Sequence, residues 1–206
     1  MCQPVTAIVL AGGASIRFGT DKLAAEVSGR PLLHHALAAV AAVADRIVVV
    51  VGPEAAGPSV PAELIGRVSF AHDAEPFRGP LAGLAAGLAA LDEGPGTGAA
   101  VALVAGGDMP WLEPAVLRLL VASLADDPGL GAATLEADPA SALPMAVRTS
   151  LALPAAQALL AEHRRALRGL LARMPSTILP AATWRALDPS GRTLRDVDAP
   201  WDLPNR

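Results

Sequence analysis

The chain has 206 residues, of which 52% are hydrophobic, and its formal net charge is −4. This length and apolar content suit one domain with a sizeable core, and we expect residues 1–206 to form a single domain. A net negative charge argues against a large nucleic-acid surface, because such surfaces are strongly basic. The single cysteine, Cys2, excludes an intrachain disulfide, and no apolar run is long enough to span a bilayer. We therefore expect a cytoplasmic protein without nucleic-acid or membrane partners.

The first half of the chain alternates short apolar runs with longer segments of helical periodicity. Val5–Leu10 is a short apolar run that ends on glycines, which predicts a buried strand. Pro31–Val43 repeats apolar residues at helical spacing, behind a proline that suits a first helical turn. The same criteria predict further strands at Arg46–Val51, Val68–Ala71 and Ala99–Val104, and helices at Gly83–Leu91 and Pro114–Leu124.

This alternation predicts an α/β protein with a three-layer, Rossmann-like fold and a mostly parallel central sheet. Runs such as RIVVVV, with no polar alternation, are typical of central strands that are buried on both faces. Ligands of such sheets bind at the carboxyl ends of the strands. Three features of the sequence follow predicted strands in this way: the pair Gly12-Gly13, Asp73 and Asp108.

The pattern is weaker beyond Gly131. Ala132–Leu135 and Met145–Val147 are predicted as strands on either side of a turn, and Leu151–Met174 is predicted to be mostly helical. The segment DVDAPWDL follows near the end of the chain and contains Asp198. No clear linker separates these elements from the first half.

The segment Ala7–Lys22, AIVLAGGASIRFGTDK, joins an apolar strand to a glycine pair and then to two cations. It is not a P-loop, because Lys22 follows an aspartate, and the dinucleotide fingerprint G-x-G-x-x-G is absent. Adjacent glycines still let the backbone approach a ligand, and the N–H groups of such a turn can bind an anion. Arg17 and Lys22 add charge for phosphate oxygens. The alternative is a strand–helix turn with solvated cations.

The string from Leu10 to Lys22 closely resembles the LAGG-x-S-x-R-M-G-x-D-K signature of the molybdenum cofactor guanylyltransferases, the MobA-like proteins. Phe18 stands where that signature usually has methionine. The resemblance is dense over Ala7–Leu112 and patchy after Gly131. It continues in the blocks SGRPLLHHAL (Ser28–Leu37), GPLAGLAAGL (Gly79–Leu88), GGDMPWL (Gly106–Leu112) and DVDAPWDL (Asp196–Leu203).

The resemblance implies a fold like that of the nucleotide-diphospho-sugar transferases and an enzyme that transfers GMP from GTP to the phosphate of molybdenum-molybdopterin. The products would be molybdopterin guanine dinucleotide and pyrophosphate. It also implies Mg²⁺ as cofactor, a monomer or weak homo-oligomer, and molybdoenzymes or other cofactor-assembly proteins as further partners. The implied catalytic residues are Lys22, Asp108 and Arg17. The implied nucleotide contacts are Leu10, Ala11, Gly12, Gly13, Lys22, Asp73 and Asp108.

Three aspartates have a purely structural alternative to a functional role. The resemblance implies that Asp108 is a Mg²⁺ ligand, but a helix N-cap ahead of the prolines that follow it fits the sequence too. Asp73 is either an aspartate of the nucleotide site or an ordinary turn residue. Asp198 is either a second metal ligand or a capping residue before the turn at Pro200.

The acceptor site is less defined than the nucleotide site. Arg164, Arg165 and Arg168 form either the solvated face of an amphipathic helix or a docking face for the acceptor phosphate. Members of the family often carry a short turn with a proline at the second-substrate site. In this chain only the proline of that turn is present, as Pro144.

The choice of nucleotide is predicted from the same loop. By resemblance, the glycine at Gly12 favours GTP, since cytidylyltransferase relatives carry alanine there, and a methyl at either glycine would narrow the site or strain a positive φ. Two rivals stay open: a cytidylyltransferase or other small-phosphate nucleotidyltransferase, and a non-catalytic nucleotide-binding domain.

Overall fold

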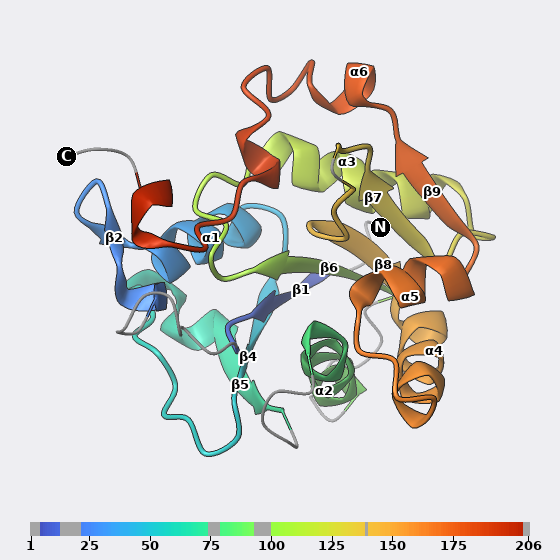
Figure 1. Cartoon of the computed structure of the whole chain (residues 1–206), viewed down its shortest axis with the longest axis horizontal. Helices are drawn as coiled ribbons and strands as arrows, with labels where there is room; N and C mark the ends of the chain where they lie inside the picture. Colours follow the sequence, from blue (N-terminus) through green and yellow to red (C-terminus); the bar gives the residue numbers. More distant parts are fainter. Residues whose placement is uncertain (1–4, 13–21, 74–78, 93–99, 139, 204–206) are drawn as a thin grey trace.

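A seven-stranded sheet forms the centre of the protein (Figure 1). The computed structural model describes residues 5–12, 22–73, 79–92, 100–138 and 140–203. The strand order across the sheet is β5-β4-β1-β6-β8-β7-β9. The strands are β1 (Val5–Leu10), β4 (Arg46–Val51), β5 (Val68–His72), β6 (Val101–Gly106), β7 (Ala132–Leu135), β8 (Met145–Arg148) and β9 (Ser176–Leu179).

The sheet is mostly parallel, as the alternation of elements predicts. Strands β5, β4, β1 and β6 run parallel to one another, and β9 runs parallel to β7. Strand β8 pairs antiparallel with both of its neighbours, β6 and β7. The two strands predicted on either side of a turn therefore form a hairpin that extends the parallel half of the sheet.

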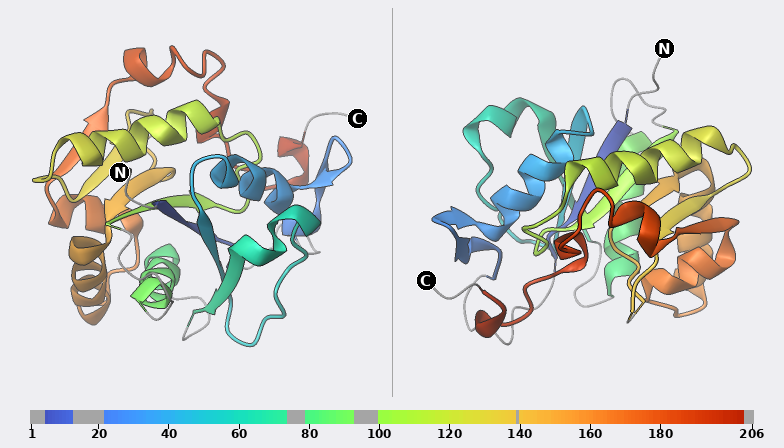
Figure 2. Two further views of the ribbon diagram at one scale, coloured as in Figure 1. Left: turned by 180° about the vertical axis from the view of Figure 1, so that it is seen from behind. Right: turned by 90° about the horizontal axis from the view of Figure 1, so that it is seen from above.

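Helices cover both faces of the sheet, which confirms the predicted three layers (Figures 1 and 2). In strand β1, Ala7 and Val9 pack into one core cluster and Ile8 into the other, because successive side chains of a strand point to opposite faces. One face carries α1 (Leu32–Ala41), α3 (Pro114–Asp126) and the short α6 (Ala181–Trp184); the other carries α2 (Pro80–Asp92), α4 (Thr149–Ala161) and α5 (Leu167–Arg173).

Glycines let helix α2 pack directly against the sheet. A Cβ added at Gly87 would lie 2.7 Å from the side chain of Ile8 and 3.0 Å from that of Val50. Gly83, one turn earlier, faces the same two strands through Leu10 and Val50. The block GPLAGLAAGL therefore encodes a close helix–sheet contact beside the ends of β1 and β4.

The prediction that Leu151–Met174 is mostly helical is confirmed, with a break that the sequence pattern does not predict. The segment forms two helices, α4 and α5, separated by residues 162–166. The connection packs against the start of α2, where the Arg165 carbonyl accepts a hydrogen bond from the Leu81 N–H at 3.3 Å. The sequence pattern does not predict strand β9 either, because Ser176–Leu179 is short; at the sheet edge its Ile178 side chain is 63% exposed.

The last part of the chain returns across the protein to the carboxyl end of β6 (Figure 2). Val197 is fully buried against Val27 and Leu32, next to the small hairpin of β2 (Glu26–Val27) and β3 (Arg30–Pro31). No helix in the described part of the chain is both long enough and apolar enough to cross a membrane.

Asp188 anchors the start of this returning segment. Its carboxylate accepts hydrogen bonds from the Ser190 hydroxyl at 2.6 Å and from the Thr193 N–H at 2.8 Å. Thr193 in turn accepts a bond from the Glu113 N–H, at the start of α3. Burial alone would raise the pKa of Asp188, but these hydrogen bonds outweigh burial and lower it.

We predict that Asp188→Asn destabilises the protein at neutral pH by about 1–2 kcal/mol, because an amide accepts only one of the two bonds. A lowered pKa in the folded state contributes stability above the unfolded pKa of about 3.9, and that contribution is lost as the pH falls through the folded pKa. Urea denaturation should therefore show a difference between wild type and variant that narrows below about pH 4. An equal difference at neutral and acid pH would contradict this account.

Candidate active site

The carboxyl ends of the parallel strands form the edge at which the predicted site residues gather. The Ala11 N–H donates to the Val50 carbonyl at 2.8 Å, and the Gly107 N–H donates to the Leu10 carbonyl at 2.9 Å. These bonds extend the pairing of β4, β1 and β6 by one residue each. The backbone after β1 is thereby held between the ends of its two neighbours.

Lys22 joins two aspartates that are far apart in the sequence. Its Nζ atom lies 2.8 Å from Oδ2 of Asp108 and 2.8 Å from Oδ1 of Asp198. The Lys22 side chain is only 13% exposed, whereas those of Asp108 and Asp198 are 29% and 56% exposed. The structure therefore brings three of the predicted site residues into direct contact, from the end of the first loop, the end of β6 and the C-terminal segment.

The charges of this cluster hold Lys22 in its ionised form. Burial by itself favours the neutral amine, but the hydrogen bonds and charges of Asp108 and Asp198 outweigh it and raise the pKa of Lys22. Asp196 lies close enough to these two carboxylates for their negative charges to affect its pKa. Partial desolvation and then the charges of Asp198 and Asp108 raise the pKa of Asp196.

Asp108 is not a helix N-cap, so that alternative is wrong. The N-cap of α3 is Glu113, whose carboxylate accepts a bond from the Ala115 N–H at 3.2 Å. The Asp108 side chain instead turns back over Gly106, where an added Cβ would lie only 2.5 Å from Oδ1 of Asp108. The first glycine of AGGDMP thus leaves the space that the carboxylate occupies.

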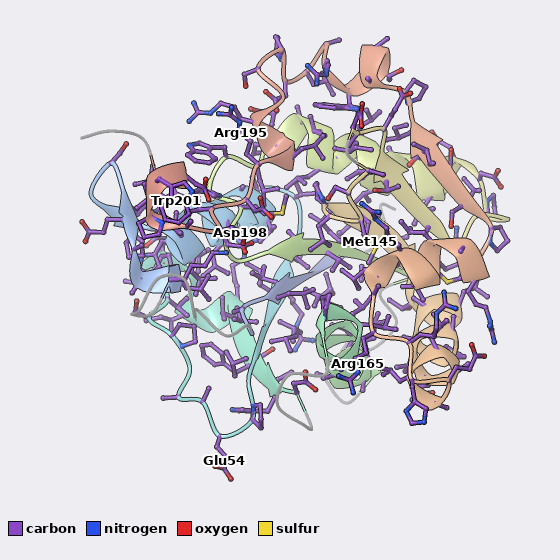
Figure 3. All side chains as sticks on the ribbon, in the orientation of Figure 1. Glu54, Met145, Arg165, Arg195, Asp198 and Trp201 are labelled. Carbon is purple, nitrogen blue, oxygen red and sulfur yellow. The ribbon has the colours of Figure 1, made fainter. Side chains whose placement is uncertain are left out.

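Asp198 is likewise not the capping residue of the turn that follows it. The carboxylate that accepts the N–H groups of Asp198 and Ala199 belongs to Asp202, at 2.9 and 2.7 Å. The neighbouring Val197 N–H donates to the Asp108 carbonyl at 3.0 Å. Figure 3 shows Asp198 on the C-terminal segment near the end of β6.

The remaining nucleotide-site predictions fall along the same edge or outside the described residues. Asp73 follows β5, three strand positions from Asp108, which corresponds to roughly 14 Å. Gly13 and Arg17 lie outside the residues that the structure describes. At Gly12 φ is not positive, and among the described residues an added Cβ would meet nothing closer than the Gly52 nitrogen at 3.5 Å, an ordinary contact. The prediction of backbone strain is therefore wrong for Gly12.

The three arginines proposed for the acceptor do not share one helical face. Arg164 and Arg165 lie in the connection between α4 and α5, and Arg168 lies in α5; all three are exposed. Figure 3 shows Arg165 beside α2, apart from Asp198. Their contact with an acceptor stays a prediction.

The carboxylates of the cluster suit a small divalent cation that is also held by phosphate. Mg²⁺ takes oxygen ligands and usually binds through one or two carboxylates together with substrate phosphates. Among the described residues, no group of three or more histidine, cysteine, aspartate or glutamate side chains is arranged to hold a metal ion alone. Asp108 and Asp198, with Lys22 between them, provide such an incomplete oxygen site.

The sequence is similar to those of a known family of nucleotidyltransferases. Residues 7–178 match the MobA-like NTP transferase domain family. The probable molybdenum cofactor guanylyltransferase of Chloroflexus aggregans is 31% identical to this chain over an alignment of 206 positions. The alignment covers 97% of this chain and 91% of that protein.

Solved structures with low sequence identity share the fold. The molybdopterin-guanine dinucleotide biosynthesis protein A of Archaeoglobus fulgidus superposes with a TM-score of 0.75 at 22% identity, covering 96% of this chain and 94% of that one. The 2-C-methyl-D-erythritol 4-phosphate cytidylyltransferase of Thermus thermophilus reaches 0.67 at 18% identity, covering 95% and 94%. At these identities the likeness is one of fold.

We predict that Gly106→Ala weakens Mg²⁺-dependent binding of a nucleoside triphosphate by roughly tenfold or more, because the new methyl displaces the Asp108 carboxylate. The fold should survive, since the clash falls on the end of a flexible side chain. Binding is measured by calorimetry and stability by thermal unfolding. Gly66→Ala, where an added Cβ has no neighbour within 4 Å, is the matched control. Wild-type affinity in a folded Gly106→Ala protein would show that this space is not needed.

Proposed function

Because the chain belongs to the MobA-like NTP transferase family, we propose that it transfers the GMP group of GTP to the phosphate of a molybdopterin-type acceptor. The products are a molybdopterin guanine dinucleotide and pyrophosphate. The name of the Chloroflexus relative, which aligns along nearly the whole chain, supports the choice of guanylyl transfer to molybdenum cofactor.

The observation that carries the proposal is the contact of Lys22 with Asp108 and Asp198 at the carboxyl edge of the sheet. Transfer of a nucleotidyl group needs the triphosphate to be positioned and its charge to be balanced more than it needs covalent help from the protein. An ionised Lys22 can balance the charge of the triphosphate, and the two carboxylates next to it can hold a metal ion that helps to position it.

In the proposed reaction, an oxygen of the acceptor phosphate attacks the α-phosphorus of GTP. A new P–O bond forms as the bond from the α-phosphorus to the bridging oxygen breaks, and that oxygen leaves with pyrophosphate. The acceptor phosphate is already ionised, so no general base is required. Lys22 holds the triphosphate and offsets negative charge on the α-phosphate as it builds.

The carboxylates of Asp108 and Asp198 are the groups that would hold Mg²⁺ in this site. Bound there, the ion neutralises charge on the phosphate oxygens. The Nζ atom of Lys22 lies 2.8 Å from one oxygen of each of these carboxylates.

The nucleotide is proposed to lie along the edge from Asp108 toward Asp73. Leu10, Ala11 and Gly12 are proposed to lie against its middle, and Gly13 and Arg17 are proposed to contribute to phosphate binding. The separation of roughly 14 Å between the ends of β6 and β5 is suited to a ligand with its phosphates at one end and its base at the other. The exposed Arg164, Arg165 and Arg168 are proposed to attract the acceptor's phosphate.

We predict that Asp108→Asn lowers the rate of Mg²⁺-dependent pyrophosphate release by roughly 10²-fold or more, because the amide is a weak metal ligand and carries no charge. Stability should change little, which thermal unfolding checks. Asp126→Asn, at the far end of α3, is the control for loss of an acidic side chain. Near-normal release by a folded Asp108→Asn protein would remove Asp108 from the metal site.

We predict that wild type prefers GTP over CTP, ATP and UTP, and that Gly12→Ala reduces this preference without loss of stability. Among the described residues, no atom would lie closer than 3.5 Å to the added methyl, so we expect any effect to arise from contact with the nucleotide. Thermal shifts with each nucleotide and Mg²⁺, followed by transfer assays, measure the preference. A preference for CTP would favour the cytidylyltransferase alternative, and nucleotide binding without turnover in the presence of acceptor would favour the non-catalytic one.

A further inference from the structure

The C-terminal segment must hold Asp198 in place although packing does not enclose its side chain. The Asp198 side chain is 56% exposed, whereas its neighbours Val197 and Ala199 are 0% and 3% exposed. A carboxylate at such a surface has many rotamers and backbone orientations available unless the main chain beneath it is fixed. The contact with Lys22 therefore depends on how the backbone from Val197 to Ala199 is held.

Two sets of hydrogen bonds fix that backbone on either side of Asp198. Before it, the Val197 N–H donates to the Asp108 carbonyl at 3.0 Å. After it, one oxygen of Asp202 accepts from the N–H groups of both Asp198 and Ala199, at 2.9 and 2.7 Å. The Asp202 N–H closes the turn by donating to the Ala199 carbonyl at 3.0 Å. Bonds from neutral donors to a carboxylate are the stronger kind of protein hydrogen bond.

From these contacts we propose that Asp202 is a positioning residue for the Lys22–Asp108–Asp198 cluster. Its carboxylate holds the main chain at Asp198 so that the Asp198 side chain faces Lys22, and Asp202 itself touches neither Lys22 nor the Asp108 side chain in the contacts described. This role rests on the proposed function where it concerns Mg²⁺ and GTP, but its structural part is independent of that function.

The test separates the hydrogen bonds of Asp202 from its charge. In Asp202→Asn the side-chain oxygen still accepts both N–H groups, whereas Asp202→Ala removes the acceptor. Amide hydrogen exchange in the whole 206-residue chain should show faster exchange at Asp198 and Ala199 in the alanine variant, and protection closer to wild type in the asparagine variant. This readout requires no substrate. Asp126→Ala provides the control for removal of an exposed carboxylate elsewhere.

The second readout is the dependence of the site on metal. With Mn²⁺ as probe in the presence of GTP, Asp202→Ala should raise the half-saturating metal concentration roughly tenfold, while Asp202→Asn stays within about threefold of wild type. In an Asp198→Ala background, adding Asp202→Ala should have no further effect, since the residue acts through Asp198.

The outcomes distinguish this proposal from the proposed function. Unchanged exchange at Asp198 and Ala199 in Asp202→Ala would overturn the positioning role, as would an asparagine variant that is as impaired as the alanine variant. If wild type neither binds Mn²⁺ with GTP nor releases pyrophosphate, the proposed function fails. A loss of amide protection in Asp202→Ala would still support the positioning role in that case.

Discussion

The candidate site depends on one ion-paired contact, that of Lys22 with Asp108 and Asp198. Asp108 lies 86 residues after Lys22 in the sequence and Asp198 lies 176 residues after it. The contact therefore joins the end of the first loop, the end of β6 and the C-terminal segment. Without the ammonium group, the two carboxylates and the nearby Asp196 would repel one another; burial first, and then the charges of Asp198 and Asp108, already raise the pKa of Asp196. The ammonium group of Lys22 offsets the negative charges of these carboxylates.

One glycine makes room for that contact, and the packing and hydrogen bonds of the C-terminal segment hold it in place. Gly106 leaves space for the Asp108 carboxylate. The C-terminal segment is tied down by the fully buried Val197 and by Asp188, which bonds to Ser190 and Thr193. Each of these positions acts on the site through geometry and not through chemistry of its own, which is why residue type alone did not identify them as important.

Most of the fold and the central residues of the site were predictable from the sequence. Apolar runs predicted β1 and β4 with their observed limits, because burial of strands between two helical layers leaves a strong local signal, and β7 was predicted with its limits from a weaker pattern. Lys22, Asp108 and Asp198 were predicted from their motifs and do lie together. The break between α4 and α5 and the edge strand β9 were missed, since both depend on packing against elements distant in the sequence.

The sequence by itself determined the α/β architecture, the strands whose ends carry the site, and the residue types available there, because these follow from local periodicity and short motifs. The tertiary structure alone decided which aspartate contacts Lys22 and which one caps a turn. It turned Asp108 toward Lys22 instead of toward α3, assigned the cap of the last turn to Asp202, and left Asp198 facing the cluster. An aspartate can cap a turn, pair with a lysine or bind a metal with equal ease. The choice is made by which donors the fold brings within hydrogen-bonding distance, and those donors come from segments that no local pattern relates.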